Sequence, residues 1–372
     1  MVVYPERWTR WRTLLVHDWL TGMRGGERVL EWLCRGFPGA PIYTLIHNRA
    51  AVSETINAHP IRVSALGRVP GIARHYRAGL PLFPAAIERF RAEPADLVLS
   101  TSHCVAKGFR PPPGARHVCY CFTPMRYAWA FHDEYLGRGW KRRLAAPLLA
   151  RLRAWDAASS ARVDRFITLS RHVRERIRRF YGRDADVVYP PVDTDFFTPG
   201  PAPGAGGYDL IVSALVPYKR IGLALRAYGE LGFPLRIVGT GSEFDRLRRA
   251  APANVSFLGR RGDDEVRALY RGCRLLVFPG EEDFGLVPVE AHACGRPVVA
   301  YGRGGVCESV VADRTGVFFN APTPEALADA VRRAAARRWN AEEIRAQAMN
   351  FTPQRFIDGL DQCLAADSGE TL

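Results

Sequence analysis

The chain lacks any long hydrophobic run and any recognisable export signal. No window approaches the roughly 18 consecutive apolar residues that a membrane-spanning helix needs. The N-terminal segment MVVYPERWTRWR lacks the apolar core of a signal peptide. We therefore expect a soluble protein that is not exported and that works in the cytoplasm.

Clustered cysteines are also missing. The eight cysteines are scattered, and the only close pair, Cys119 and Cys121, lies in the apolar stretch HVCYC. That stretch is typical of a strand and not of a metal-binding knuckle. We expect reduced thiols and no metal site.

Lysine is scarce although the chain is strongly basic. Only three of its 52 basic residues are lysines, and the formal net charge is +14, so coding bias contributes to the balance. Residues 138–183 hold fourteen basic and three acidic residues on helical segments. This pattern fits either a solvated face or a surface for an anionic membrane or a lipid diphosphate. Nucleic acid is disfavoured, because no nucleic-acid motif accompanies the charge.

The length of 372 residues predicts two domains, and 47% hydrophobic residues suffice to build their cores. Short apolar strand patterns alternate with helical patterns throughout, which predicts α/β domains with parallel sheets. Residues 199–207 contain three prolines and four glycines and form the one linker-like segment. We therefore expect one domain over residues 1–198 and a second over residues 199–350.

The most specific chemistry lies in residues 275–297, LLVFPGEEDFGLVPVEAHACGRP. A short apolar strand ends at Pro279-Gly280, an acidic loop follows, and a helix then runs to Gly295. Loops at the carboxyl end of a parallel strand bind ligands in such folds, and the N-terminus of the next helix attracts anions. Glu282 and Glu290 can both border this site, so a fitting ligand has hydroxyls for carboxylates and phosphates for backbone N–H groups.

A nucleotide sugar has both groups. The Glu-x7-Glu spacing with an internal Phe-Gly resembles the signature of the retaining GT-B glycosyltransferases of family 4. The resemblance implies that Glu282 binds the donor sugar and Glu290 the ribose, while the turn between them binds sugar and diphosphate through Phe284, Gly285, Leu286 and Val287. The alternative interpretation is an acidic solvated loop before an ordinary core helix.

The first domain carries weaker signals. Residues 12–17 form a strand pattern, followed by Asp18, the pair Gly25-Gly26 and a helical pattern. The glycine pair resembles the family's N-terminal glycine loop, which lies against donor diphosphate and acceptor, although a tight turn would use the same glycines. His103 follows the strand pattern of residues 96–100. Its place at a strand end favours a catalytic site residue over a structural histidine.

Residues 122–129, FTPMRYAW, resemble a subgroup that includes bacterial surface-polysaccharide mannosyltransferases, which often shows His-Thr-Pro-Met-Arg-Tyr. Here Phe122 stands at the histidine position. Because a phenyl ring has no donor or acceptor, either His103 supplies the contact or donor recognition has shifted. Asp18 and Arg126 are the candidate acceptor-binding residues.

The second domain begins with a strand pattern and ALVPYKR. The resemblance implies that Lys219 contacts the donor diphosphate. The family commonly has an arginine where this chain has Ala214, so Arg220 or Arg303 must compensate. The remaining implied donor contacts are Gly239, Gly241 and Arg260.

The resemblance implies two Rossmann-like domains facing across a cleft, with a helix in residues 351–372 crossing back to the first domain. It further implies metal-independent transfer of a hexose without a cofactor, catalysed with Glu282, Lys219 and His103. The donor we favour is GDP-mannose, and the acceptor a glycan or a polyprenyl-diphosphate-linked glycan at the inner membrane face. A GT-B nucleotide-sugar epimerase and a non-catalytic nucleotide-sugar-binding protein are the alternatives.

Overall fold

The structure, a computed structural model, describes residues 2–69, 71–72, 76–129, 140–200 and 206–366. Three parts of the sequence expectations lie outside the described residues: the start of the basic stretch at residues 138–139, residues 201–205 of the linker, and the tail at 367–372. The chain forms two compact units, one of Met1–Pro190 with Phe356–Leu372 and one of Pro191–Arg355. Each unit is described by itself below.

The first unit contains a parallel sheet that, among the described residues, has seven strands in the order β3-β2-β1-β4-β5-β6-β7. The order reverses between β1 and β4, because later strands add to opposite sides of β1. Ligands of open α/β sheets bind at such a switch point, outside the carboxyl ends of the strands. The strands are β1 (Thr13–His17), β2 (Ile42–Thr44), β3 (Ile61–Val63), β4 (Leu97–Ser102), β5 (Arg116–Cys121), β6 (Arg165–Thr168) and β7 (Asp186–Val187).

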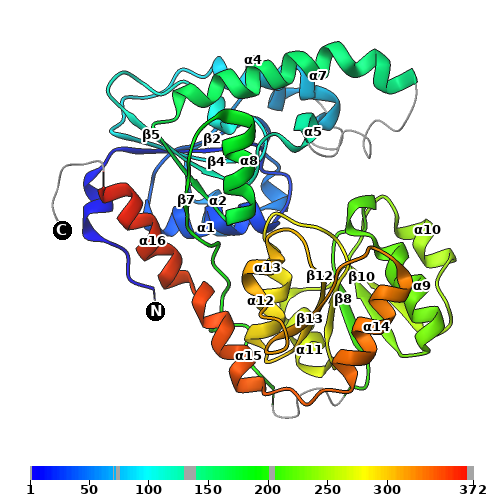
Figure 1. Cartoon of the computed structure of the whole chain (residues 1–372). Helices are drawn as coiled ribbons and strands as arrows, with labels where there is room; N and C mark the ends of the chain where they lie inside the picture. The colour runs from blue at the N-terminus through cyan, green and yellow to red at the C-terminus, as the bar shows by residue number, and fades with distance from the viewer. Residues whose placement is uncertain (1, 70, 73–75, 130–139, 201–205, 367–372) are drawn as a thin grey trace. The chain divides into compact units, whose positions relative to one another are not determined.

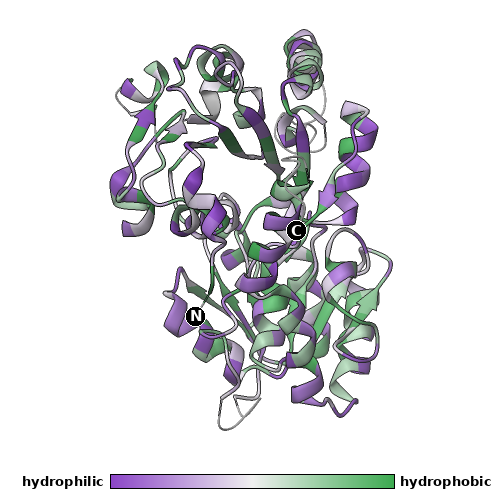
Figure 2. Cartoon of the chain, turned by 90° about the vertical axis from the view of Figure 1, so that its left-hand side faces the viewer, coloured by the Kyte–Doolittle hydropathy of each residue, from purple (hydrophilic) through white to green (hydrophobic). Residues whose placement is uncertain are grey.

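Helices cover both faces of this sheet (Figure 1). Leu14, Val16 and Val98 of the central strands pack in one core with Ile87 of α4 and Leu152 of α7. Figure 2 shows the strands largely green and the helices alternating between green and purple, as expected for helices with one buried face. The helices are α1 (Gly25–Gly36), α2 (Glu54–Asn57), α4 (Phe83–Glu88), α5 (Arg126–Trp129), α7 (Trp140–Ser159), α8 (Arg171–Tyr181) and α16 (Pro353–Ala365), with 3-10 turns including η1 (Glu6–Arg10) and η5 (Ala106–Gly108).

The second unit repeats this architecture with a parallel sheet of six strands, counted over the described residues, in the order β10-β9-β8-β11-β12-β13. Its switch point lies between β8 and β11. The strands are β8 (Asp209–Val212), β9 (Leu235–Val238), β10 (Val255–Gly259), β11 (Leu276–Phe278), β12 (Val298–Tyr301) and β13 (Gly316–Phe319). The helices are η7 (Pro217–Lys219), α9 (Ile221–Leu231), α10 (Phe244–Arg249), α11 (Asp263–Gly272), α12 (Leu286–Ala293), α13 (Val306–Ser309), α14 (Pro324–Ala335) and α15 (Ala341–Ala348).

The two parallel sheets with their helices confirm the predicted pair of Rossmann-like units. The first unit ends before residue 199, where the sequence analysis places the boundary. Residues 191–198 belong to the second unit because the Arg345 guanidinium of α15 donates to the carbonyls of Thr194 and Phe197, each at 3.1 Å. In the described part of the chain, no helix combines the length and the apolar character needed to cross a membrane.

Helix α16 returns to the first unit and lies beside the N-terminal segment (Figure 1). The Asp361 carboxylate accepts hydrogen bonds from Arg7 Nε and from Trp8 Nε1, both at 2.8 Å. The Arg116 guanidinium donates to the carbonyl of Leu364 at 2.6 Å, at the end of the helix. Charged and indole donors therefore hold the last helix against the first unit.

Replacing Asp361 by Ala is expected to lower the free energy of unfolding by about 1–3 kcal/mol, because the Arg7 and Trp8 donors lose a charged acceptor. The measurement is the shift in the urea-unfolding midpoint. Asp329→Ala is the matched control, since its ion pair with Arg333 is exposed and spaced i,i+4 on α14. Such a pair contributes at most about 0.5 kcal/mol. Equal effects of both changes would refute the anchoring role.

Candidate functional site

At the switch point of the first sheet, a buried carboxylate organises the strand ends. Asp18 follows β1 and is fully buried. Its two oxygens accept hydrogen bonds from the backbone N–H groups of His103, Cys104, Val105 and Ala106 at 2.6–3.0 Å. His103 Nδ1 lies 3.0 Å from the same carboxylate. Asp18 was expected among the acceptor-binding residues, but its oxygens are engaged inside the protein, so it positions the turn after β4.

Burial alone would raise the pKa of Asp18. The neighbouring His103 ring and the backbone N–H groups outweigh burial and lower the pKa to about 2. The carboxylate is therefore charged at neutral pH. His103 is itself part-exposed, and its ring lies perpendicular to the Trp19 ring at a centroid distance of 4.5 Å. The Asp18 carboxylate and the Trp19 ring thus hold this predicted catalytic residue at the strand end.

The predicted glycine loop is the first turn of α1. Gly25 and Gly26 open the helix, and the Glu27 carboxylate accepts the backbone N–H of Arg24 at 3.1 Å. A Cβ atom on Gly26 would lie 3.3 Å from Cε2 of Phe122 and 3.6 Å from Cε1 of His17. The structure therefore brings Gly26 and Phe122 together with His17, which the sequence analysis did not single out. Arg126, the other tentative acceptor residue, begins α5.

At the switch point of the second sheet, two predicted residues meet. Lys219 ends η7, after β8, and Glu282 lies in the loop after β11. The Lys219 ammonium forms an ion pair with the Glu282 carboxylate, and both side chains are largely buried. The Lys219 ammonium and the Glu282 carboxylate, which follow different strands, are therefore in direct contact.

Glycines hold the acidic loop in position. Gly304 has a φ of 83° and pairs in a short parallel bridge with Glu282. A Cβ atom on Gly304 would lie 2.4 Å from the Glu282 carbonyl oxygen, so only glycine permits this approach. The backbone N–H of Gly305 donates to the same carbonyl at 2.8 Å. The turn after β12 is therefore bound to the acidic loop.

Helix α12 carries the remaining part of the acidic motif. Gly285 caps its N-terminus with a φ of 89°, and Leu286 and Val287 form its first turn. Phe284 is buried and packs on Phe351 at a ring distance of 5.4 Å. The Glu290 carboxylate accepts the Tyr270 hydroxyl of α11 at 2.8 Å. Tyr270, absent from the sequence analysis, thus fixes the orientation of Glu290, and no sequence pattern links the two.

The other predicted donor residues follow strands β9 and β10. Gly239 has a φ of 128°, and a Cβ atom there would lie 1.9 Å from the Ser213 carbonyl oxygen. At Gly241 the Cβ would lie 2.3 Å from the Leu215 carbonyl oxygen, so both glycines serve close backbone packing. Arg260 is exposed after β10.

Arg220 has an unusual conformation for a residue with a side chain. Its φ is 54°, its guanidinium lies 4.8 Å from the ring centroid of Tyr301, and its buried Nη1 has no hydrogen-bond partner among the described residues. Arg303 also lies near the Tyr301 ring, at 5.9 Å, but is exposed. A buried guanidinium nitrogen without a protein partner is suited to an anion.

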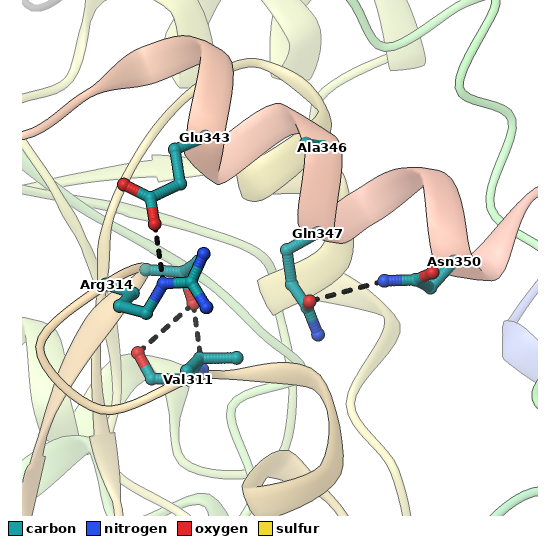
Figure 3. A pocket seen from close by; sticks show the side chains of 7 residues that line it. Val311, Arg314, Glu343, Ala346, Gln347 and Asn350 are labelled. Carbon is teal, nitrogen blue, oxygen red and sulfur yellow. Dashed lines mark hydrogen bonds and ion pairs between the residues drawn. The ribbon is translucent and has the colours of Figure 1, made fainter.

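A hollow of about 240 Å³ lies elsewhere on the second unit, between α15 and the turn at residues 311–315 (Figure 3). Arg314 and Glu343 form an ion pair of 2.5 Å across it, and both side chains are solvent-exposed. Gln347 accepts from Asn350 at 3.3 Å. The hollow contains none of the predicted site residues.

Among the residues that the structure describes, three histidines are fully buried: His17 and His117 in the first unit and His292 in the second. Burial lowers their pKa values to about 3, 4 and 4, respectively. They stay neutral in the folded chain, whereas an unfolded histidine binds a proton below about pH 6.5. Their contribution to stability is therefore complete above about pH 6.5 and is lost as the pH falls toward 4 and below.

We expect the urea concentration at the unfolding midpoint to decrease as the pH is lowered from about 7 to about 5. In the wild type, His292 Nε2 lies 3.1 Å from the Thr315 carbonyl oxygen. His292→Gln keeps an amide donor for this carbonyl but has no titratable group. The decrease should therefore be smaller in this variant. Urea titrations of both proteins at each pH measure this difference. Parallel pH profiles for the two proteins would contradict it.

Comparisons with known proteins agree with the geometry. The model "Glycosyltransferase Family 4" matches residues 23–196, and "Glycosyl transferases group 1" matches residues 201–351. An uncharacterized glycosyltransferase of Methanocaldococcus jannaschii is 26% identical over 55% of this chain and 62% of its own. The D-inositol 3-phosphate glycosyltransferase of Acidothermus cellulolyticus is 32% identical over 55% of this chain and 54% of its own. The chain thus spans only about half to three-fifths of these relatives.

Among solved structures, Anabaena HepE in complex with UDP-glucose has a TM-score of 0.65 and 18% identity, over 95% of this chain and 99% of that one. At this identity the likeness shows the fold, which is GT-B. The two family models together account for most of the chain, one for each unit. Residues 23–196 therefore match a family 4 glycosyltransferase domain and residues 201–351 a group 1 glycosyltransferase domain, on a GT-B fold.

Proposed function

We propose that the chain transfers a hexose from a nucleotide diphosphate donor to an acceptor hydroxyl, with retention of the anomeric configuration. The observation that carries this proposal is the meeting of Lys219 and Glu282 at the switch point of the second sheet. A carboxylate accepts hydrogen bonds from sugar hydroxyls, and an ammonium pairs with phosphate oxygens. A donor placed here satisfies both groups at once.

The charge of the leaving diphosphate must be stabilised in the transition state. In this proposal Lys219, Arg220 and the backbone N–H groups of the first turn of α12 do so, without a divalent cation. Arg220 takes over from the arginine that the family commonly has where this chain has Ala214. Its buried Nη1 without a described partner supports that role.

The ribose is assigned to Glu290. Tyr270 donates to one oxygen of this carboxylate at 2.8 Å and so holds the side chain in one orientation. A carboxylate fixed in this way discriminates a ligand that offers hydroxyl donors from one that does not. His103 is assigned to the reacting side of the first unit, where Asp18 positions it.

GDP-mannose is the donor we propose, from the resemblance of residues 122–129 to surface-polysaccharide mannosyltransferases. HepE, of the same fold, is in complex with UDP-glucose, which makes UDP-glucose the comparison donor. The proposed acceptor is a glycan or lipid-linked glycan at the inner face of the plasma membrane, with the basic residues of α7 and α8 toward anionic headgroups.

A non-catalytic nucleotide-sugar-binding protein is the second candidate, and Phe122 and Ala214 favour it, because each replaces a polar residue of the family pattern. An epimerase would isomerise the donor without an acceptor. NMR of the products formed from one donor, with and without acceptor, distinguishes the three functions. Transfer needs the acceptor, an epimerase converts the donor without it, and a binding protein forms no product.

Glu282→Ala is expected to lower transfer at least about a hundredfold, because it removes the carboxylate that binds the donor sugar. Product formation from GDP-mannose and from UDP-glucose over a panel of glycan acceptors measures the loss. Glu230→Ala, on the exposed face of α9, is the control and should retain transfer. Unchanged transfer in Glu282→Ala would sink the assignment, and tight donor binding by the wild type without turnover would support the binding protein.

The donor base can be identified from ligand-induced stabilisation. At a hundred times its dissociation constant, a nucleotide that binds only the folded chain stabilises it by about 2.7 kcal/mol. We expect GDP to raise the thermal midpoint more than UDP or ADP. The increase should be much smaller in Lys219→Ala, which lacks the ammonium for the diphosphate. Equal shifts in both proteins would show that the nucleotide binds elsewhere.

A further inference from the structure

A buried ion pair joins the turn after β4 to helix α7. Lys107 of η5 and Asp156 of α7 are each at most 1% exposed, and the Lys107 ammonium lies 2.9 Å from one oxygen of the Asp156 carboxylate. The ammonium also donates to the Asp156 carbonyl and to the Ser159 hydroxyl, both at 2.6 Å. Ser159 is the last residue of α7, and the helix dipole favours a cation at that end.

The other oxygen of the Asp156 carboxylate holds two further elements. It accepts from Trp129 Nε1, at the end of α5, at 2.7 Å, and from the Tyr181 hydroxyl, at the end of α8, at 2.9 Å. One turn earlier on α7, the Arg153 side chain donates to the Ala128 carbonyl at 2.7 Å. The last turn of α5 is therefore bound to α7 through both its backbone and its indole.

These contacts close a frame around two of the predicted site residues. Strands β4 and β5 are paired in the sheet up to their carboxyl ends. Residues 103–107 leave β4, begin with His103 and end at the buried lysine. Residues 122–129 leave β5 and contain Arg126. The sheet thus fixes each segment at one end, and Asp156 fixes both at the other end.

Stability alone does not account for a buried pair of this kind. Withdrawing both charges from water offsets much of their attraction, and well-packed apolar residues of similar volume are often as stabilising. The rings of Tyr181 and Trp155 lie 4.8 and 5.3 Å from the ammonium, so an apolar side chain would find suitable neighbours there. Hydrogen-bonded charges differ from apolar side chains in holding their partners in one geometry. The pair therefore fixes positions more than it adds stability.

We propose that the pair of Lys107 and Asp156 is a positioning device of the transfer site, which holds the turn with His103 and the segment with Arg126 in one fixed relation. Both side chains of the pair are buried, so they act on a substrate only through these two segments. This role rests on the proposed function, because it concerns transfer to an acceptor at the first unit.

Hydrogen exchange of the full chain, followed by mass spectrometry, tests the coupling without any substrate. Lys107→Met removes the ammonium, so the turn is no longer joined to Asp156. We expect faster exchange in residues 103–108 and also in residues 122–129, the segment that Asp156 joins to this turn. Faster exchange in residues 103–108 alone would overturn the proposal.

Two donors to the same carboxylate oxygen provide a matched pair of variants. Trp129→Phe removes the donor of α5 but keeps a ring that can stack on Phe180, 4.5 Å away between centroids. We expect it to speed exchange in residues 103–108. Tyr181→Phe removes the donor of α8, which carries no predicted site residue, and should leave exchange in residues 103–108 and 122–129 as in the wild type.

The same variants are then compared in sugar transfer. Because a misplacement of about 1 Å costs about a hundredfold in rate, we expect Lys107→Met to lower kcat about a hundredfold. Trp129→Phe should mainly raise KM for the acceptor, since Trp129 ends the segment with Arg126. Tyr181→Phe should keep the wild-type kcat and KM. GDP affinity, measured by calorimetry, should be unchanged in all three, because the proposed diphosphate contacts lie in the second unit.

A double variant separates positioning from loss of folding. Lys107→Met alone leaves a buried carboxylate without its cation, which is strongly destabilising. Lys107→Met/Asp156→Asn removes both charges and keeps a carbonyl acceptor for Trp129 and Tyr181. We expect its urea-unfolding midpoint to lie nearer that of the wild type, while kcat stays low because the turn is still not joined to α7. Wild-type kcat in this double variant would overturn the positioning role.

The remaining outcomes are also decisive. Equal losses of kcat in Lys107→Met and Tyr181→Phe would indicate general destabilisation and would overturn the proposal. Coupled exchange with wild-type kcat in Lys107→Met would show that the frame is structural only. Absence of transfer by the wild type over the acceptor panel would instead refute the proposed function, and hydrogen exchange would still measure the coupling by itself.

Discussion

The candidate site of the first unit depends on the buried carboxylate of Asp18. Withdrawing a charge from water is costly unless hydrogen bonds compensate, and here four backbone N–H groups and the His103 ring do so. These N–H groups belong to the turn after β4, so the carboxylate joins the ends of β1 and β4 at the switch point. The position of His103 follows from this bond network.

The second unit fixes its switch point by close backbone contact. Gly304 and Gly239 approach neighbouring carbonyl oxygens more closely than any side chain allows, and the acidic loop is held by the Gly305 N–H. Glu282 of this loop forms the ion pair with Lys219. The switch points of the two sheets thus differ in chemistry: a buried carboxylate with histidine rings in the first, and a pair of opposite charges in the second.

Local patterns in the sequence predict the elements well, because apolar strands, helix caps and glycine stops are local signals. β1 lies within the strand pattern of residues 12–17, β4 overlaps that of residues 96–100, and α12 ends just before Gly295. The short strands β3 and β13 were not among the predicted elements. Three or four residues are too few for a periodic pattern to distinguish a strand from a loop.

The partners of the site residues could not be predicted. The fold brings Asp18 to the turn at His103 and Tyr270 to Glu290. No spacing of residues in the sequence predicts either contact. The hydrogen bond of His17 to Thr101 likewise joins two neighbouring strands. The sequence locates candidate chemistry at strand ends, and the fold decides which groups face a ligand.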